Sequence, residues 1–423
     1  MVTDARVVPI PYVKRLLFAF ACVWCGWIEP ASAAAQDSSP PSVTVDDPSG
    51  LSKLVAEAVE NNPSLRARFN RWRELSLQVS TANTLPEPTL SVAYFVRAVE
   101  TRVGPQRARV ALRQRVPWPT KLDASREHAA ATALAERRAL DAEVLALRRD
   151  VALEYWQIWE LQRALELHRE HLTVLEALSA SVRSRVETGR ATVADLQQVE
   201  LTLERLADQV MTLESRMERR TARLAELVGA PGTLALTPMD TPRSELELPY
   251  EASVLEGAPE RHPSPASFRE LGRAATAHAR HASASRWPDF TLGVEWIPTD
   301  DARIPDTPGS GQDAWIAGVS LDLPVWRGSY SDAIDAAAAR VDAANARAQG
   351  AVHSLRRHLS VALAEHGDAR RRVELYRGVL IPKAQAVHGS ILGGYATGAT
   401  ELAQALLSQG ELLELRVELA RVR

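Results

Sequence analysis

Apolar and polar residues recur with a helical period along most of the chain. Across residues 120–187, apolar or small side chains return at steps of three and four, and residues 190–229 repeat the pattern. A version with smaller side chains covers 334–380 and is followed by 399–423. Steps of three and four, sustained this long, indicate coiled-coil helices. At 1.5 Å per residue the first helix would span roughly 100 Å, which no globular core requires.

Glycine and proline mark where these helices should end or loosen. Gly189 and Gly398 stand where each long helix should reverse into its return helix. Glycine accepts the left-handed conformation that ends a helix without steric cost. Pro382 interrupts the second long helix, which should kink or loosen there because proline lacks a backbone N–H.

Four short segments alternate with period two instead, which predicts strands at about 89–97, 110–116, 291–296 and 315–323. One predicted face is apolar and includes Val92, Val294, Val319 and Leu321. The opposite face carries charged side chains, among them Arg113, Arg115, Glu295 and Asp322. The segments between the paired strands, 98–106 and 299–312, read as loops, and we expect them to face the outside of the cell.

Strands of 9–11 residues have the length that a tilted strand needs to cross a bilayer. On this interpretation the apolar face meets lipid and the four charged residues line a water-filled lumen. Two hairpins folded onto a soluble core remain the alternative. Four strands cannot close a barrel, and open edges are not tolerated in lipid, so several chains would share one barrel. Two chains would supply eight strands and three would supply twelve.

The N-terminus has the layout of a secretory signal peptide at 1–35, with three basic residues, an apolar run over 16–28 and an Ala-rich end. A membrane anchor, or a lipoprotein signal at Cys22, are the alternatives. Both cysteines lie in this run, so the mature chain would have neither disulfides nor thiolate metal sites. The leader has three basic and two acidic residues, so its removal changes the net charge from −3 to −4. This charge does not indicate a nucleic-acid-binding protein.

An internal repeat organises the rest of the chain. "PEPTLSVAYF" at 86–95 returns as "PDFTLGVEWI" at 288–297, and three further pairs of segments, one before it and two after it, keep the same order at a similar spacing. We therefore predict a first structural repeat at 36–229, a connecting segment at 230–252 and a second repeat at 253–423 with a short final helix. Each repeat would contain a helix, two strands, a very long helix and a return helix.

Motifs for catalysis or cofactor binding are not found in the sequence. It has no phosphate-binding loop, no nucleophile elbow and no zinc-protease motif, so we expect neither an enzyme nor a cofactor. His168 and His171, like His278 and His281, form i,i+3 pairs that could hold a metal or simply face solvent. We predict no metal site.

Four segments carry a resemblance to a known family. Residues 54–92, 113–122, 182–203 and 379–413 resemble the TolC-type outer-membrane efflux proteins. The resemblance implies a mainly α-helical fold with a small β part. It also implies a homotrimer, with a shared twelve-stranded transmembrane β-barrel in outer-membrane lipid and an α-barrel of helical hairpins in the periplasm.

The family serves as the exit duct of tripartite efflux pumps, docked to a periplasmic adaptor and an inner-membrane transporter. The Pro-aromatic-Pro-x-Lys segment at 117–121 most resembles members serving heavy-metal exporters of the resistance-nodulation-division type, which usually have Gly where this chain has Thr120. A channel for type I protein secretion and, less well, a soluble periplasmic adaptor are the alternatives. The final helix is shorter than is usual in the family, which leaves natural shortness and truncation open.

The second helix reversal is acidic. No lysine or arginine occurs from 384 to 415, whereas Glu401, Glu411 and Glu414 do. We place Glu401 in the first turn of the return helix, where the helix dipole favours a carboxylate. In a trimer, three Glu401 side chains would also surround a narrow mouth and raise the local cation concentration. The sequence thus predicts Glu401 either as a helix-end carboxylate or as a selectivity residue at the gate.

Overall fold

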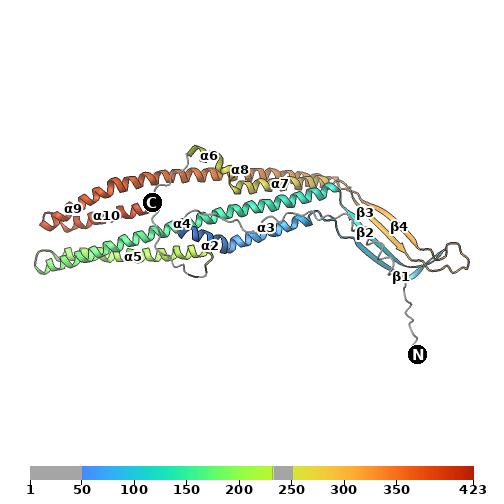
Figure 1. The fold of residues 1–423 in the computed structure, drawn as a ribbon, viewed down its shortest axis with the longest axis horizontal. Helices are drawn as coiled ribbons and strands as arrows, with labels where there is room; N and C mark the ends of the chain where they lie inside the picture. The colour runs from blue at the N-terminus through green and yellow to red at the C-terminus, as the bar shows by residue number, and fades with distance from the viewer. Residues whose placement is uncertain (1–49, 231, 233–250) are drawn as a thin grey trace, which may run out of the picture. The chain divides into compact units, whose positions relative to one another are not determined.

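The computed structural model describes residues 50–230, 232 and 251–423. The predicted leader and most of the connecting segment lie outside the described residues. The first half contains α2 (Gly50–Asn61), α3 (Pro63–Thr81), β1 (Thr89–Thr101), β2 (Gly104–Val116), α4 (Pro119–Glu187) and α5 (Val193–Val228) (Figure 1). The second half contains α6 (Glu251–Arg261), α7 (Pro263–Ala284), β3 (Asp289–Ile297), β4 (Ala314–Asp322), α8 (Arg327–Leu375), a π-helical turn η1 (Tyr376–Leu380), α9 (Ile381–Thr397) and α10 (Leu402–Val422).

Helix α4 is the central element, and its 69 residues confirm the long helix predicted from periodicity. Pro119 occupies its first turn, where a missing N–H costs nothing and the fixed φ favours helix. Gly189 and Gly398 adopt φ values of 69° and 81°, so both predicted helix reversals are confirmed. After the first reversal, Thr192 and Asp195 form a reciprocal capping box that starts α5.

The second long helix is interrupted as predicted. Residues 376–380 form a π-helical turn directly before Pro382, and the Ile381 N–H donates to the Tyr376 carbonyl five residues earlier. Pro382 has no N–H to offer the carbonyl four residues before it, so the regular ladder cannot continue there. Such turns are local weak points in a helix. Helix α4 has no equivalent interruption.

The largest buried cluster holds the first helical hairpin to α2. It joins side chains of α2, α4 and α5, including Val55, Leu140, Ile158 and Leu224, which are all at most 3% exposed. Each such side chain contributes roughly 1.5–3 kcal/mol on burial. Asn62 ties the same region together, since its amide donates to the Leu227 carbonyl and its oxygen caps α3.

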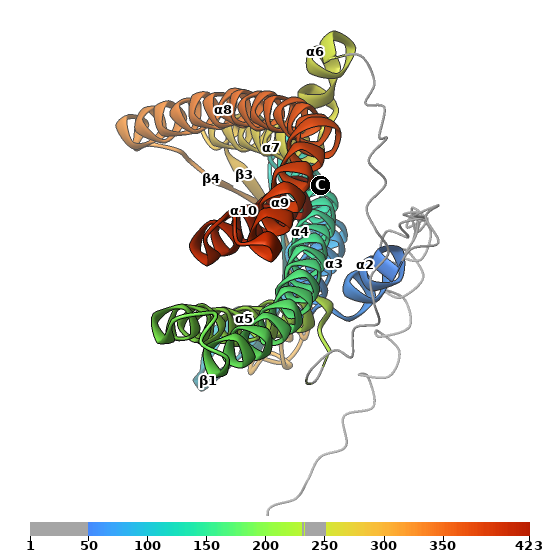
Figure 2. The same ribbon diagram turned by 90° about the vertical axis from the view of Figure 1, so that its left-hand side faces the viewer.

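Helix α4 also contacts elements from the second half of the chain. It packs against α7, which in turn packs against α8 (Figure 2). The buried side of α7 consists largely of small residues, such as Gly272, Ala274 and Ala277, which permits close approach of the neighbouring helices. A second buried cluster of Val182, Val199 and Leu402 joins the two helical hairpins near their reversals.

The four strands form one antiparallel sheet in the order β1-β2-β3-β4, so the middle pair joins the two halves of the chain. The predicted strand positions are confirmed, but β1 and β2 are longer than expected at 13 residues each, whereas β3 and β4 have nine. None of the helices among the described residues combines the length and apolar character needed to cross a bilayer.

The prediction of a loop at 98–106 is wrong, because most of these residues belong to the two longer strands. Thr101 pairs directly with Gly104, which leaves a two-residue turn. Gly104 makes this turn possible with a φ of 137°. The β3–β4 loop covers the turn, since the Asp300 and Gly311 amides donate to the Pro105 and Val103 carbonyls at 3.0 and 2.9 Å. Hydrogen bonds to the β3–β4 loop thus allow β1 and β2 to continue beyond the residues whose side chains alternate between apolar and polar.

Candidate functional site

The sheet has one apolar and one charged face, as its register establishes. One row across the four strands consists of Val92, Val110, Trp296 and Trp315. Two rows further along the same face, Leu292 lies opposite Val319. The side chains of this face are widely exposed, with Val92 and Val319 at 69% and 66%. A large exposed apolar patch of this kind marks an interaction surface.

The opposite face carries the predicted charged residues in mostly paired form. Arg109 contacts Glu295 at 2.6 Å, and Arg115 contacts Asp322 at 3.5 Å. Nearer the β1–β2 turn, Arg107 contacts Asp300 at 2.8 Å. The register therefore brings Arg113, Arg115, Glu295 and Asp322 to one face. Their predicted position in a lumen stays a prediction.

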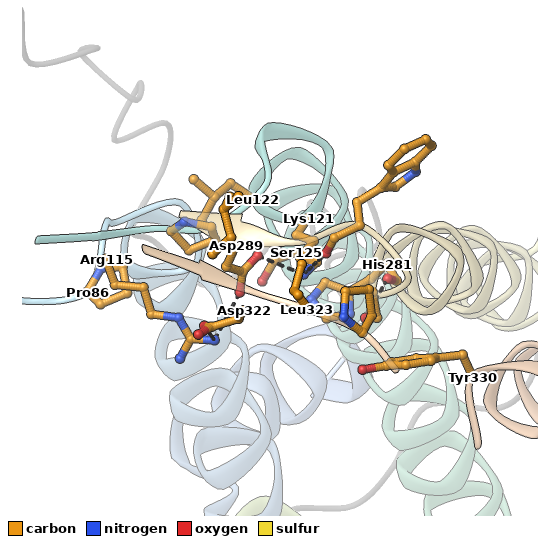
Figure 3. Close-up of a pocket in the computed structure, with 15 residues that line it drawn as sticks. Pro86, Arg115, Lys121, Leu122, Ser125, His281, Asp289, Asp322, Leu323 and Tyr330 are labelled. Carbon is orange, nitrogen blue, oxygen red and sulfur yellow. Dashed lines mark hydrogen bonds and ion pairs between the residues drawn. The ribbon is translucent and has the colours of Figure 1, made fainter. Parts of the chain in front are cut away.

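Asp289 is the structural centre of the joint between sheet and helix, and it is absent from the sequence predictions. Its carboxylate accepts hydrogen bonds from Lys121 Nζ at 2.7 Å and Arg115 Nη2 at 2.9 Å (Figure 3). It also accepts one from the Trp118 backbone N–H at 3.0 Å. The side chains of Asp289 and Lys121 are only 9% and 13% exposed. Lys121 also donates to the Trp287 carbonyl at 2.9 Å. One carboxylate thus connects the start of β3, the end of β2 and the first turn of α4.

Aromatic rings stiffen the same joint. Trp118 stacks on Trp287 with ring centroids 5.4 Å apart and on Phe290 at 5.8 Å. Beside them lies a cavity of about 800 Å³ lined by charged and polar groups, including Arg115, Lys121, His281, Asp289, Asp322 and Tyr330 (Figure 3). The Pro-Trp-Pro segment is therefore a fixed connection between strand and helix.

Two features of the sequence could have pointed to Asp289. It is an acidic residue at the start of a predicted strand, in the segment that repeats "PEPTLSVAYF". Its partners Arg115 and Lys121 flank the Pro-Trp-Pro segment. No spacing rule links them, however, because they lie more than 160 residues from Asp289 in the chain.

Glu401 lies beside the second helix reversal but differs from its predicted position. It is the N-cap residue of α10 rather than a residue of its first turn, and its side chain makes no capping hydrogen bond. Its backbone is extended, at φ −82° and ψ 153°. The first reversal differs, because Thr192 caps α5 and Arg183 contacts Glu200 at 2.8 Å. Glu401 is exposed and has no ion pair among the residues that the structure describes.

Helix α4 joins the second hairpin through a layer of polar side chains. The Gln409 amide nitrogen lies 3.1 Å from His171 Nδ1, and His388 Nδ1 lies 2.9 Å from the buried Ser408 hydroxyl. Burial lowers the pKa of His171, and the nearby His168 and His388 lower it further. Neutral imidazoles therefore suit this layer.

The predicted histidine pairs do not form larger clusters. His168 contacts the Ala164 carbonyl of its own helix, whereas His278 lies 3.4 Å from Arg340 and edge-on to His128. Within residues 50–230, 232 and 251–423, no group of three or more His, Cys, Asp or Glu side chains is arranged to hold a metal ion.

Comparison with known proteins places the fold. No family model matches the sequence, and no curated relative matches it. Several solved structures are similar. The outer membrane protein VceC from Vibrio cholerae is 18% identical with a TM-score of 0.71, over 88% of this chain and 92% of VceC. CusC, a transmembrane channel, is 17% identical with a TM-score of 0.72 over 94% of both chains. The outer-membrane channel OprN is 20% identical with a TM-score of 0.74, over 89% of this chain and 87% of OprN.

The helical hairpins and the four-stranded sheet thus have the same arrangement as in these solved structures. The chain has the fold of these outer-membrane channels, which confirms the TolC-type fold expected from the sequence.

Proposed function

We propose that the chain is the outer-membrane exit duct of a tripartite efflux system. The observation that carries this proposal is the four-stranded sheet, which has an apolar face, a charged face and two unpaired edges at β1 and β4. An isolated sheet of this kind is unstable in water and in lipid. Its strands continue through a fixed joint into a helix of 69 residues, as a duct that crosses a membrane and a wide aqueous gap requires.

A homotrimer satisfies both open edges. Three copies would supply twelve strands in a shared transmembrane barrel, with the Val92–Val319 face toward lipid and the face of Arg113, Arg115 and Glu295 toward the lumen. Twelve strands leave room for a pore, whereas the eight strands of a dimer fill with side chains. The six hairpins of three chains would form the periplasmic tunnel.

The partners follow from this geometry. The ends of the hairpins near Gly189 and Gly398 are the surfaces that a periplasmic adaptor would reach, and an inner-membrane transporter would supply the energy. The resemblance of the Pro-Trp-Pro-Thr-Lys joint to family members that serve heavy-metal exporters favours a transporter of the resistance-nodulation-division type that exports metal ions or small toxic compounds.

Glu401 is our candidate for the gate. Its exposed side chain makes no capping hydrogen bond, so the helix dipole, on which the predicted helix-end role rests, is what favours its charge at this helix end. Three such carboxylates around a closed mouth would favour cations. In planar bilayers under a salt gradient, Glu401→Gln should lower cation selectivity and Glu401→Lys should lower it further. Unchanged reversal potentials in both variants would place the gate elsewhere.

The proposed function is tested by oligomeric state and by export. Protein extracted in detergent should have about three times the mass of the mature chain, and a stable monomer in water without detergent would contradict the proposal. Deletion of the gene should sensitise cells to members of a panel of copper, cobalt, zinc and drugs, and restoring the gene should reverse this. Unchanged sensitivity together with loss of a secreted protein would instead favour the protein-secretion role.

A further inference from the structure

Arg113 differs from the other arginines on its face of β2. Arg107, Arg109 and Arg115 each contact a carboxylate within 3 Å. Arg113 is exposed and has no ion pair or hydrogen bond within the described part of the chain. Its five N–H donors are therefore available to a ligand.

The surface beside Arg113 is hollowed. In the row across the sheet, Arg113 lies opposite Gly293, which lies opposite Gly318. A side chain added at Gly293 would lie 3.5 Å from Arg113 Cγ, and one added at Gly318 would meet nothing within 4 Å. The neighbouring rows on either side end at Ile316 and Ser320, which line this hollow. Together these rows border an open hollow of about 380 Å³ on the face of the sheet.

The charges and donors around this hollow favour an anion. Glu295 is the carboxylate in its wall, and Arg109 already neutralises it at 2.6 Å. Thr291 and Ser320 add hydroxyl groups from the neighbouring row. A planar guanidinium with free donors matches the two oxygens of a carboxylate or phosphate group. A cation would meet an unpaired positive charge and a carboxylate that is already occupied.

The geometry points to a binding site for carboxylate- or phosphate-bearing solutes, formed by Arg113 over the glycines 293 and 318. On the proposed function, on which its role depends, the site lies in the barrel lumen once in each of three copies. Arg113 is then a specificity residue that gives anionic solutes a stopping point in the barrel, far along the chain from Glu401. The site acts on passing solutes without a conformational change.

Binding of inorganic triphosphate to the detergent-solubilised protein tests the site. Line broadening in ³¹P spectra should show saturable binding to the wild type, and Arg113→Ser should weaken it about tenfold, the loss of one charge-assisted contact. Gly318→Leu keeps every charge but fills the hollow, and it should weaken binding similarly. Arg107→Ser is the matched control, since it removes the same charge about 20 Å away on the same face. That distance exceeds the screening length of about 8 Å at physiological salt, so its binding should change less than about twofold.

Three results would overturn the inference. These are absence of saturable binding to the wild type, equal weakening by Arg113→Ser and Arg107→Ser, and unchanged binding in Gly318→Leu. Because the assay needs no current, it is separable from the proposed function. Triphosphate binding by a protein that gives no conductance in planar bilayers would contradict the duct and leave the anion site in place.

Discussion

Replacing Asp289 by Asn should destabilise the joint strongly, and the structure indicates which partner is responsible. The change removes a charge while keeping the size of the side chain. Arg115 is 55% exposed and retains Asp322, so it loses little. Lys121 is only 13% exposed and would keep its charge without a carboxylate. Leaving one partner of a buried pair uncompensated costs about 3–5 kcal/mol, and we expect Asp289→Asn to lose that much unfolding free energy.

Tryptophan fluorescence during guanidinium titration of the detergent-solubilised protein measures this loss, because Trp118 and Trp287 stack beside the carboxylate. Asp300→Asn is the matched control. It breaks a contact of similar length to Arg107, but both partners are more than half exposed, so the loss should stay below about 1 kcal/mol. Adding Lys121→Met to Asp289→Asn should restore part of the stability. Equal losses in Asp289→Asn and Asp300→Asn, or no recovery in the double variant, would refute the reasoning.

Three further predictions concern the sheet, a helix end and pH. Val319→Arg places a charge on the face proposed to meet lipid and should cost roughly 2–4 kcal/mol near the bilayer midplane; Ser320→Arg on the opposite face should assemble normally, and equal heat-stable trimer yields would contradict the assignment of faces. Gly229→Ala and Gly189→Ala both place an alanine in the left-handed conformation, which costs about 1 kcal/mol or more. Only at position 229 would the new Cβ also clash, since it would lie 2.8 Å from a backbone oxygen of α2. Gly229→Ala should therefore have the lower unfolding midpoint of the two. Burial lowers the pKa of His171, so the unfolded chain binds a proton at this residue more readily than the folded chain does. The free energy of unfolding should therefore fall by up to about 1.4 kcal/mol per pH unit as the pH falls below about 6.5. Unfolding midpoints measured across this range should fall less steeply in His171→Gln than in the wild type.

The sequence predicted those parts of the fold that depend on local periodicity. The limits of α4, the reversals at Gly189 and Gly398 and the weak point before Pro382 each depend on residues within a few positions of one another. The two faces of the strands follow for the same reason, since alternation places residues on a face whatever the neighbouring strand is.

Contacts between distant segments could not be predicted in this way. The site at Asp289 depends on partners that only the β2–β3 pairing brings close. The β1–β2 loop was misjudged because the strands extend through contacts with the β3–β4 loop. Glu401 was misplaced by a position because α10 begins after an extended residue, which composition does not reveal.

The pairing of β2 with β3 also constrains how the protein is made. Arg115 and Asp289, which meet at this pairing, are 174 positions apart, and the whole first hairpin of helices lies between them. During synthesis, the β1–β2 hairpin therefore exists with the inner edge of β2 bare until β3 in the second half of the chain arrives. A bare edge invites pairing with the wrong strand, and contacts this distant in the chain form slowly. Folding of this protein thus depends on protecting a half-finished sheet until the second half of the chain is made.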